Sequence, residues 1–137
     1  MEVLLVGQAD SIFFEHYTKT IKKQRPDINF NVFSVDAIQG KYDLSACNLV
    51  HINSWVESPY RKIKGVRTIL QPFITWLSLY IFLKRNKKRY DIIHFKWLIP
   101  GVILFPNIIR KYTIKTIATF WGSEMESQNL LFSKNLY

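Results

Sequence analysis

Two apolar, strand-like segments near the carboxyl end of the chain each finish in polar and aromatic side chains. The first is YDIIHFKW, residues 90–97, and the second is TIATFWGSE, residues 116–124. The apolar run of residues 98–112 between them is long enough for one helix. Two strands joined by one helix are typical of a parallel sheet, whose functional side chains gather where the strands end. We therefore expect a ligand crevice near His94, Lys96 and residues 122–124.

The rest of the chain also alternates between segments that are typical of strands and segments that are typical of helices. An apolar run at residues 3–6 and an alternating pattern at residues 28–35 predict two strands, and a short third strand is expected at residues 48–53. Ser11 is a suitable N-cap for a helix that runs to about Lys23, and a long helix should end near Arg89. This order predicts an α/β fold, a Rossmann-like parallel sheet with helices on both faces. The buried stripe of the first helix is expected to contain Ile12, Phe13, Tyr17 and Ile21.

Composition favours one globular domain over residues 1–137, since 48% of the residues are hydrophobic and 15% are aromatic. The single cysteine, Cys47, cannot form an internal disulfide, and it is expected to be a small buried side chain. The start of the chain lacks the basic residues and cleavage site of a secretory signal. We expect a cytoplasmic protein.

The net charge of +9 comes from one segment, residues 61–89, which contains no Asp or Glu. Such a segment can face anionic lipid headgroups, where each basic residue contributes about 1 kcal/mol. It can also face nucleic acid, or simply be a solvated surface. Its basic residues are Arg61, Lys62, Lys64, Arg67, Lys84, Arg85, Lys87, Lys88 and Arg89.

An apolar stretch, residues 69–83, lies between the two basic clusters of this segment. Gln71 and Pro72 interrupt it, which leaves too few residues to span a membrane. Helical spacing places one set of side chains on a single face, and two roles are open for that face: packing on the sheet, or lying in a membrane interface. The set is Phe73, Trp76, Leu77, Tyr80 and Ile81.

The remaining sequence evidence for ligand sites is weaker. The loop from Gly7 to Ser11 joins a strand to a helix and can present backbone amides to an anion. However, it has one glycine and matches no phosphate-loop fingerprint. His16 reads as a surface residue and His51 as a strand residue, whereas His94 ends an apolar strand and is either structural or functional. No histidines or cysteines have metal-ligand spacing, so no metal site is predicted.

Three segments of the chain, residues 3–11, 90–97 and 119–124, together resemble the amino-terminal domain of GT-B fold glycosyltransferases of family 4. The resemblance covers nearly the whole chain. It implies two facing Rossmann-like domains, the first holding mainly the acceptor and the second the sugar nucleotide. It also implies transfer with retention, without a metal or another cofactor, from a nucleotide sugar to a glycan or lipid-linked acceptor, as in the synthesis of bacterial surface polysaccharides.

The resemblance also assigns roles to residues. Gly7, Asp10 and Ser11 would lie beside the donor's phosphate or the transferred sugar. His94, Lys96 and Trp97 would line the acceptor crevice, and Trp121, Gly122, Ser123 and Glu124 would lie at its floor. His94, Lys96 and Glu124 are the expected catalytic groups, and the others are expected to bind substrate.

The chain departs from the family pattern in two residues and in length. The family commonly has a histidine where Lys96 stands and an aspartate where Glu124 stands. A lysine can stabilise negative charge but lacks the neutral acceptor nitrogen of imidazole. The second domain does not follow Tyr137. The resemblance therefore predicts an acceptor-side fragment that is inactive alone.

Two alternatives remain open. In the first, the chain is a noncatalytic basic module that docks on the inner face of the cell membrane through residues 61–89. In the second, it is a nucleic-acid-binding protein. Nucleic acid is the least favoured partner, because the basic residues flank an apolar helix instead of alternating with exposed aromatics.

Overall fold

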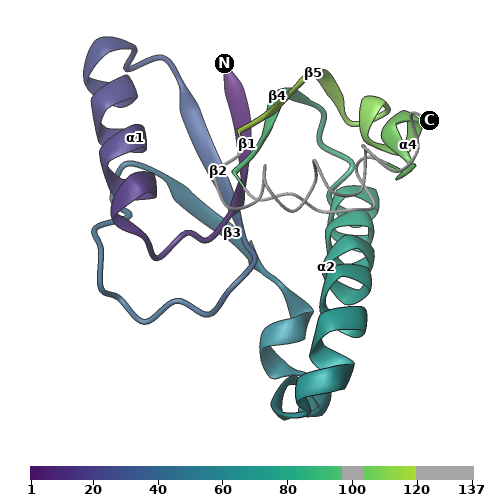
Figure 1. The fold of residues 1–137 in the computed structure, drawn as a ribbon. Coiled ribbons are helices and arrows are strands. Elements are labelled where there is room, and N and C mark those ends of the chain that lie inside the picture. Colours follow the sequence, from purple (N-terminus) through teal and green to yellow (C-terminus); the bar gives the residue numbers. More distant parts are fainter. Residues whose placement is uncertain (97–103, 120–137) are drawn as a thin grey trace, which may run out of the picture.

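Five parallel strands form one sheet in the order β3-β2-β1-β4-β5 (Figure 1). The computed structural model of the protein describes residues 1–96 and 104–119. The predicted Rossmann-like α/β fold is confirmed, with strand positions close to those expected. The strands are β1 (Glu2–Gly7), β2 (Asn29–Ser34), β3 (Asn48–Ile52), β4 (Tyr90–Phe95) and β5 (Thr113–Ala118).

The two long helices, α1 (Ile12–Gln24) and α2 (Lys64–Asn86), lie on opposite faces of the sheet (Figure 1). The 3₁₀ turns η1 (Ser54–Glu57) and η2 (Pro59–Lys62) lead from β3 into α2, and the short helix α4 (Pro106–Arg110) precedes β5. α2 ends three residues before Arg89, because Lys87 takes a left-handed conformation with φ of 51° and its amide closes the last turn on the carbonyl of Leu83.

The central strand β1 contributes to a core on each face. Val3 and Leu5 pack in the cluster that includes Phe14 of α1, whereas Leu4 and Val6 pack in the cluster that includes Leu79 and Leu83 of α2. Alternate residues of a strand point to opposite faces, so an apolar run is buried on both sides. Burial of each such side chain contributes about 1.5–3 kcal/mol.

The predicted N-cap of α1 is confirmed, but the predicted buried stripe is partly wrong. The Ser11 hydroxyl accepts a hydrogen bond from the amide of Phe14 at 3.4 Å. Ile12 and Phe13 are 47% and 59% exposed, and Phe14 and Thr18 are buried instead. Thr18 can be buried because its hydroxyl donates to the carbonyl of Phe14 at 2.8 Å. The buried stripe therefore begins at Phe14, two residues later than the pattern of apolar residues predicts.

The orientation of α2 disagrees with one of the two roles left open for its apolar face, packing on the sheet. Phe73, Leu77 and Ile81 of that face are exposed, and the helix runs unbroken through Gln71 and Pro72. The buried residues of α2 are Thr75, Ser78, Leu79 and Leu83. The two hydroxyl groups among them have hydrogen-bond partners, which removes most of the cost of burying them.

Candidate functional site

The carboxyl ends of β1 and β4 form the point at which the strand order changes direction. From β1 the chain proceeds to β2 and β3 on one side, and β4 lies on the other side. Val6 pairs with Phe95, and beyond the strands the amide of Lys96 donates to the carbonyl of Val6 at 2.7 Å. Ligands of open α/β sheets bind at such a switch point. The ends of β1, β4 and β5 share one edge, as predicted.

Gly7 allows these two strand ends to approach closely. A β-carbon at Gly7 would lie 2.8 Å from the Cβ of Lys96 and 3.0 Å from the ring of Phe14. The first distance is shorter than a carbon–carbon contact permits, and the second would require the ring of Phe14 to shift. Glycine is needed here for space, and the structure brings Gly7 and Lys96, two of the predicted site residues, side by side.

His94 is held by hydrogen bonds at both ring nitrogens. Its Nδ1 lies 3.0 Å from the hydroxyl of Tyr17 on α1, and its Nε2 lies 2.7 Å from the hydroxyl of Thr119. A neutral imidazole has one donor and one acceptor nitrogen, and each hydroxyl can complement either. The side chain is 5% exposed. This network links the helix α1 to the ends of β4 and β5.

The surroundings of His94 favour its neutral form. Burial, followed by the charge of Lys96, lowers the pKa of His94 to about 4. Burial also raises the pKa of the Tyr17 hydroxyl. Both groups of this hydrogen bond are therefore uncharged near neutral pH, and His94 is arranged to fix neighbouring side chains in place.

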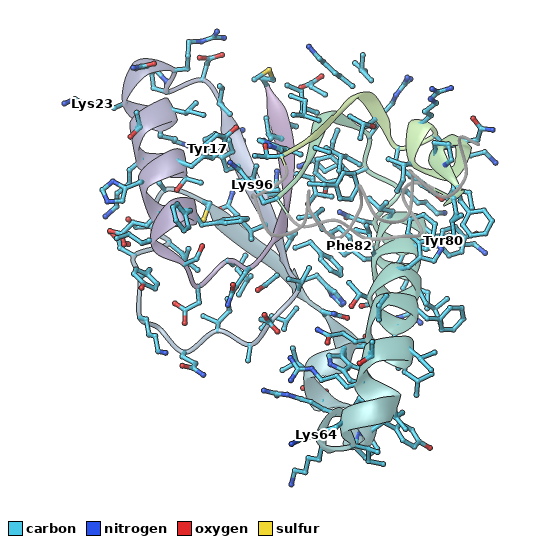
Figure 2. The ribbon with its side chains drawn as sticks, viewed as in Figure 1. Tyr17, Lys23, Lys64, Tyr80, Phe82 and Lys96 are labelled. Atoms are coloured by element: carbon cyan, nitrogen blue, oxygen red, sulfur yellow. The ribbon has the colours of Figure 1, made fainter. Side chains whose placement is uncertain are left out.

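Lys96 lies across the ring of Tyr17, and Figure 2 shows the two side chains together. Its Nζ is 3.6 Å from the centre of the ring, within range of a cation–π interaction. Burial lowers the pKa of Lys96. Within the described parts of the chain, Lys96 has no carboxylate partner. A half-buried cation without a counterion can bind a ligand oxygen.

The loop between β1 and α1 is fixed by internal bonds. Asp10 accepts hydrogen bonds from the amides of Gln39, Lys41 and Tyr42 at 2.9, 3.0 and 3.2 Å. Ser11 caps α1 and donates to the carbonyl of Gln8 at 2.9 Å. Asp10 thus anchors the loop of residues 39–42, a role that sequence alone does not indicate because its partners are backbone amides.

Five predicted site residues lie outside the described residues: Trp97, Trp121, Gly122, Ser123 and Glu124. Tyr17 and Thr119 join the site without having been predicted to bind. The signal for Tyr17 is its place one turn after Phe14, on the face of α1 that packs on the sheet. Among the described residues, no group of three acidic, histidine or cysteine side chains is placed to hold a metal.

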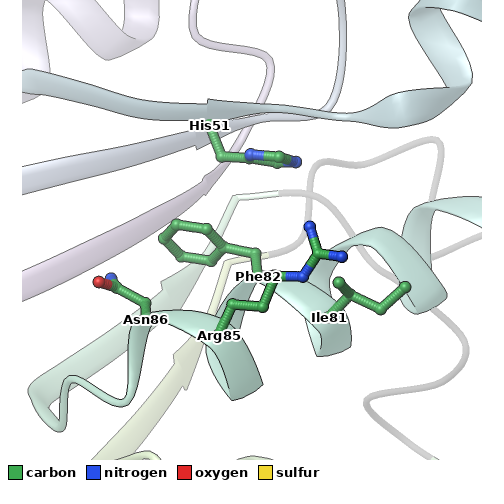
Figure 3. Close-up of a pocket in the computed structure, with 5 residues that line it drawn as sticks. All are labelled: His51, Ile81, Phe82, Arg85 and Asn86. Atoms are coloured by element: carbon green, nitrogen blue, oxygen red, sulfur yellow. The ribbon is translucent and has the colours of Figure 1, made fainter.

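A separate cavity of about 300 Å³ lies between β3 and α2, away from the switch point. Figure 3 shows His51 of β3 facing Phe82 and Arg85 of α2. The ring of His51 stacks on both Phe33 and Phe82, with its centre 5.3 Å from each, and the two phenyl rings also contact each other with centres 5.8 Å apart. Burial lowers the pKa of His51. His51 is a residue of β3 as expected, but its Nε2 lies 3.5 Å from the hydroxyl of Ser78 on α2, so its hydrogen-bond contact is not local. Ile81 of α2 also lines the cavity.

Comparison with known proteins identifies no relative. No protein family matches the chain, and no curated protein or solved structure matches it.

Proposed function

We propose that the chain is the acceptor-side domain of a retaining glycosyltransferase, which moves a sugar from a nucleotide-sugar donor to a glycan or lipid-linked acceptor in bacterial surface polysaccharide synthesis. The sequence resemblance suggests this activity. The observation that carries it on the structural side is the side-by-side placement of Gly7 and Lys96 at the switch point, with Tyr17 and His94 behind them.

The chemistry of sugar transfer matches the groups at this edge of the sheet. The bond from the anomeric carbon to the donor's phosphate oxygen breaks, a bond to the acceptor oxygen forms, and the proton of the acceptor hydroxyl passes to the departing phosphate. Negative charge then develops on the departing diphosphate, and a fixed cation in a site that excludes water stabilises it. Lys96 is the described residue that supplies such a cation. Gly7, where β1 ends and the loop to α1 begins, lies beside it.

His94 has a positioning role in this proposal. Both ring nitrogens are bonded to Tyr17 and Thr119, so proton transfer to a substrate would require one of these bonds to break. Through Tyr17, His94 instead holds the ring on which the Lys96 ammonium rests. The proposal places Lys96 in contact with the substrate and His94 behind it.

A turnover assay over a panel of nucleotide sugars and lipid-linked acceptors tests the proposal. We expect residues 1–137 alone to give no product, because the resemblance places the donor's main binding groups in a second domain. In a chain that also carries such a domain, Lys96→Ala should lower kcat/KM by roughly a hundredfold, as loss of a charge-stabilising group does. The control is Lys23→Ala, an exposed lysine at the far end of α1 (Figure 2), which should leave kcat/KM unchanged.

Two results would count against the proposal. Robust turnover by residues 1–137 alone would overturn the need for a second domain. An active two-domain protein that tolerates Lys96→Ala as well as Lys23→Ala would remove the switch point from the mechanism.

A further inference from the structure

The side of α2 that faces the sheet is unusually polar. Thr75 and Ser78 are buried there, and each is satisfied by a side chain that follows β3. The Asn53 amide donates to the Thr75 hydroxyl at 2.6 Å, and the hydroxyls of Ser54 and Ser78 lie 3.1 Å apart. These bonds fix which side of the helix points inward. The more apolar side of α2 is consequently turned away from the core.

Four large apolar side chains form a line along that outward side, which we call the outer stripe: Ile69, Phe73, Leu77 and Ile81. They are 76%, 62%, 42% and 39% exposed. Residues four apart lie above one another on a helix, so the stripe is continuous over about 18 Å. Exposed apolar residues scattered singly are ordinary, but a contiguous row of this length marks an interaction surface.

Aromatic residues widen the stripe at one side. The ring of Trp76 stacks on Phe105, with ring centres 6.1 Å apart, and Phe105 is itself 50% exposed. Figure 2 shows Tyr80 on the outer side of α2, with Phe82 on the side of the sheet. Trp and Tyr have apolar rings with a polar edge, and such residues are enriched where a membrane meets water.

Positive charge is concentrated at both ends of the outer stripe. Residues 58–90 contain nine basic residues and no acidic residue. Arg61, Lys62, Lys64 and Arg67 lie just before or at the start of α2, and Lys84, Arg85, Lys87, Lys88 and Arg89 lie at or just after its end. Within the described residues, Lys88 is the member of this set that forms an ion pair, with Glu2 at 2.7 Å. The charge therefore complements an anionic surface.

α2 is long and apolar enough to cross a membrane by length and composition. Its buried residues argue against a membrane span. Leu79 and Leu83 are in the core that contains Leu4 and Val6 of β1, so lipid cannot surround the helix while the sheet is folded. A helix with an apolar outer side and basic ends lies in the plane of a membrane interface, with the apolar side inserted.

We propose that α2 docks the folded chain on an anionic lipid bilayer, with the outer stripe inserted into the interface and the two basic clusters on the headgroups. The inference rests on the exposure and charge of α2 and is independent of the proposed glycosyltransferase activity. It commits to a membrane as the occupant because a second copy of this chain would bring like-charged clusters together, whereas an anionic bilayer neutralises them.

Sedimentation with vesicles of phosphatidylcholine containing 30% phosphatidylglycerol as the anionic lipid tests this proposal. We expect the chain to bind these vesicles, to lose binding at high salt and not to bind pure phosphatidylcholine. Phe73→Gln, Leu77→Gln and Ile81→Gln combined should weaken binding at least tenfold. Lys84→Gln, Arg85→Gln and Lys87→Gln combined should weaken it on the order of a hundredfold, because each basic residue near the surface contributes about fivefold.

Matched control variants distinguish docking through α2 from nonspecific adsorption to vesicles. Ile114→Gln removes an apolar residue that is 71% exposed on β5, and Lys23→Gln, Lys41→Gln and Lys115→Gln remove three exposed charges elsewhere. Neither control should change vesicle binding, and all variants should keep the thermal midpoint of the parent chain. Equal effects of test and control variants would overturn the proposal.

A fluorophore that responds to polarity, placed on Leu77→Cys in a Cys47→Ala background, should brighten with anionic vesicles, whereas the same label on Ile114→Cys should not. If the chain instead sediments as a dimer without lipid, and the variants of the outer stripe make it monomeric without affecting vesicles, the occupant is a second copy and the membrane proposal is wrong.

Discussion

The ammonium of Lys96 rests 3.6 Å from the ring centre of Tyr17, and the hydroxyl of the same tyrosine lies 3.0 Å from Nδ1 of His94. One side chain of α1 thus positions a residue of β4 and the residue that follows β4, which lie 77 and 79 positions later in the chain. The face of the tyrosine ring contacts Lys96, whereas its hydroxyl bonds to His94. Different substitutions of Tyr17 can therefore remove one contact and keep the other.

Tyr17→Phe keeps the ring beneath Lys96 but removes the hydroxyl that bonds His94. We expect the free energy of unfolding to fall by about 1 kcal/mol, the net contribution of one hydrogen bond. Tyr17→Leu also removes the ring. A double-mutant cycle of Tyr17→Leu with Lys96→Met, measured by urea unfolding, should give a coupling of about 0.5–2 kcal/mol for the cation–π contact. A coupling near zero would show that the two side chains do not interact in solution.

Gly7→Ala should destabilise the fold by about 1–3 kcal/mol, since the new methyl group would overlap Lys96 Cβ and the Phe14 ring. Gly65 in the first turn of α2 is the matched control, because nothing lies within 4 Å of the β-carbon it would gain. Gly65→Ala should stabilise the chain by up to about 1 kcal/mol, through helix propensity. Thermal and urea unfolding of both variants measure the contrast. If Gly7→Ala behaves like Gly65→Ala, the strand ends are not as close as described.

His94 should make stability depend on pH in a defined window. Its pKa is lowered to about 4 in the folded chain, compared with about 6.5 when unfolded. Between these values the unfolded chain binds more protons, so stability falls as the pH drops from about 6.5 to about 4. His94→Gln should lose this contribution to the pH dependence, and His16→Gln on the exposed side of α1 is the control. Identical slopes in the parent chain and His94→Gln would mean that His94 is not buried in its neutral form.

Asn53 should be the most sensitive of the residues that orient α2. It is 1% exposed, its amide donates to Thr75 and to the carbonyl of Val35, and its oxygen accepts from the amide of Trp55. Asn53→Ala leaves buried polar groups without partners, and each costs about 1–3 kcal/mol. The paired change Asn53→Ala with Thr75→Val should recover part of the loss, which chemical denaturation can measure. If Asn53→Ala lowers the free energy of unfolding by less than about 0.5 kcal/mol, as substitutions of exposed residues do, the described orientation of α2 is contradicted.

The strands of this fold could be predicted from sequence because each has apolar residues at half or more of its five or six positions and is followed by polar groups or a turn. The direction in which α2 faces could not. The helix is apolar on most sides, and periodicity does not reveal which apolar side meets the sheet when Asn53 and Ser54 satisfy Thr75 and Ser78 across it. A buried hydroxyl becomes acceptable only through a partner about twenty residues away, and local patterns do not contain that information.

The candidate site also has residues that could be predicted from sequence and contacts that could not. His94 and Lys96 could be proposed because they end a buried strand, and Gly7 because it ends another. The bond between Tyr17 and His94 depends on how α1 packs on the sheet, and the anchoring of Asp10 depends on backbone amides of residues 39, 41 and 42. Such contacts have no signature in the residue types of the chain.

The most direct test of the central claim is to map ligand binding by amide chemical shifts in labelled chain, titrated with a panel of mono- and disaccharides and nucleotide sugars. We expect saturable shifts for at least one member, centred on the amides of Gly7 and Lys96. They should be absent in Lys96→Met and retained in Lys23→Met. If no member of the panel gives saturable shifts, or if the shifts centre on His51 and Arg85 at the other cavity, the switch point between β1 and β4 is not a sugar-binding site.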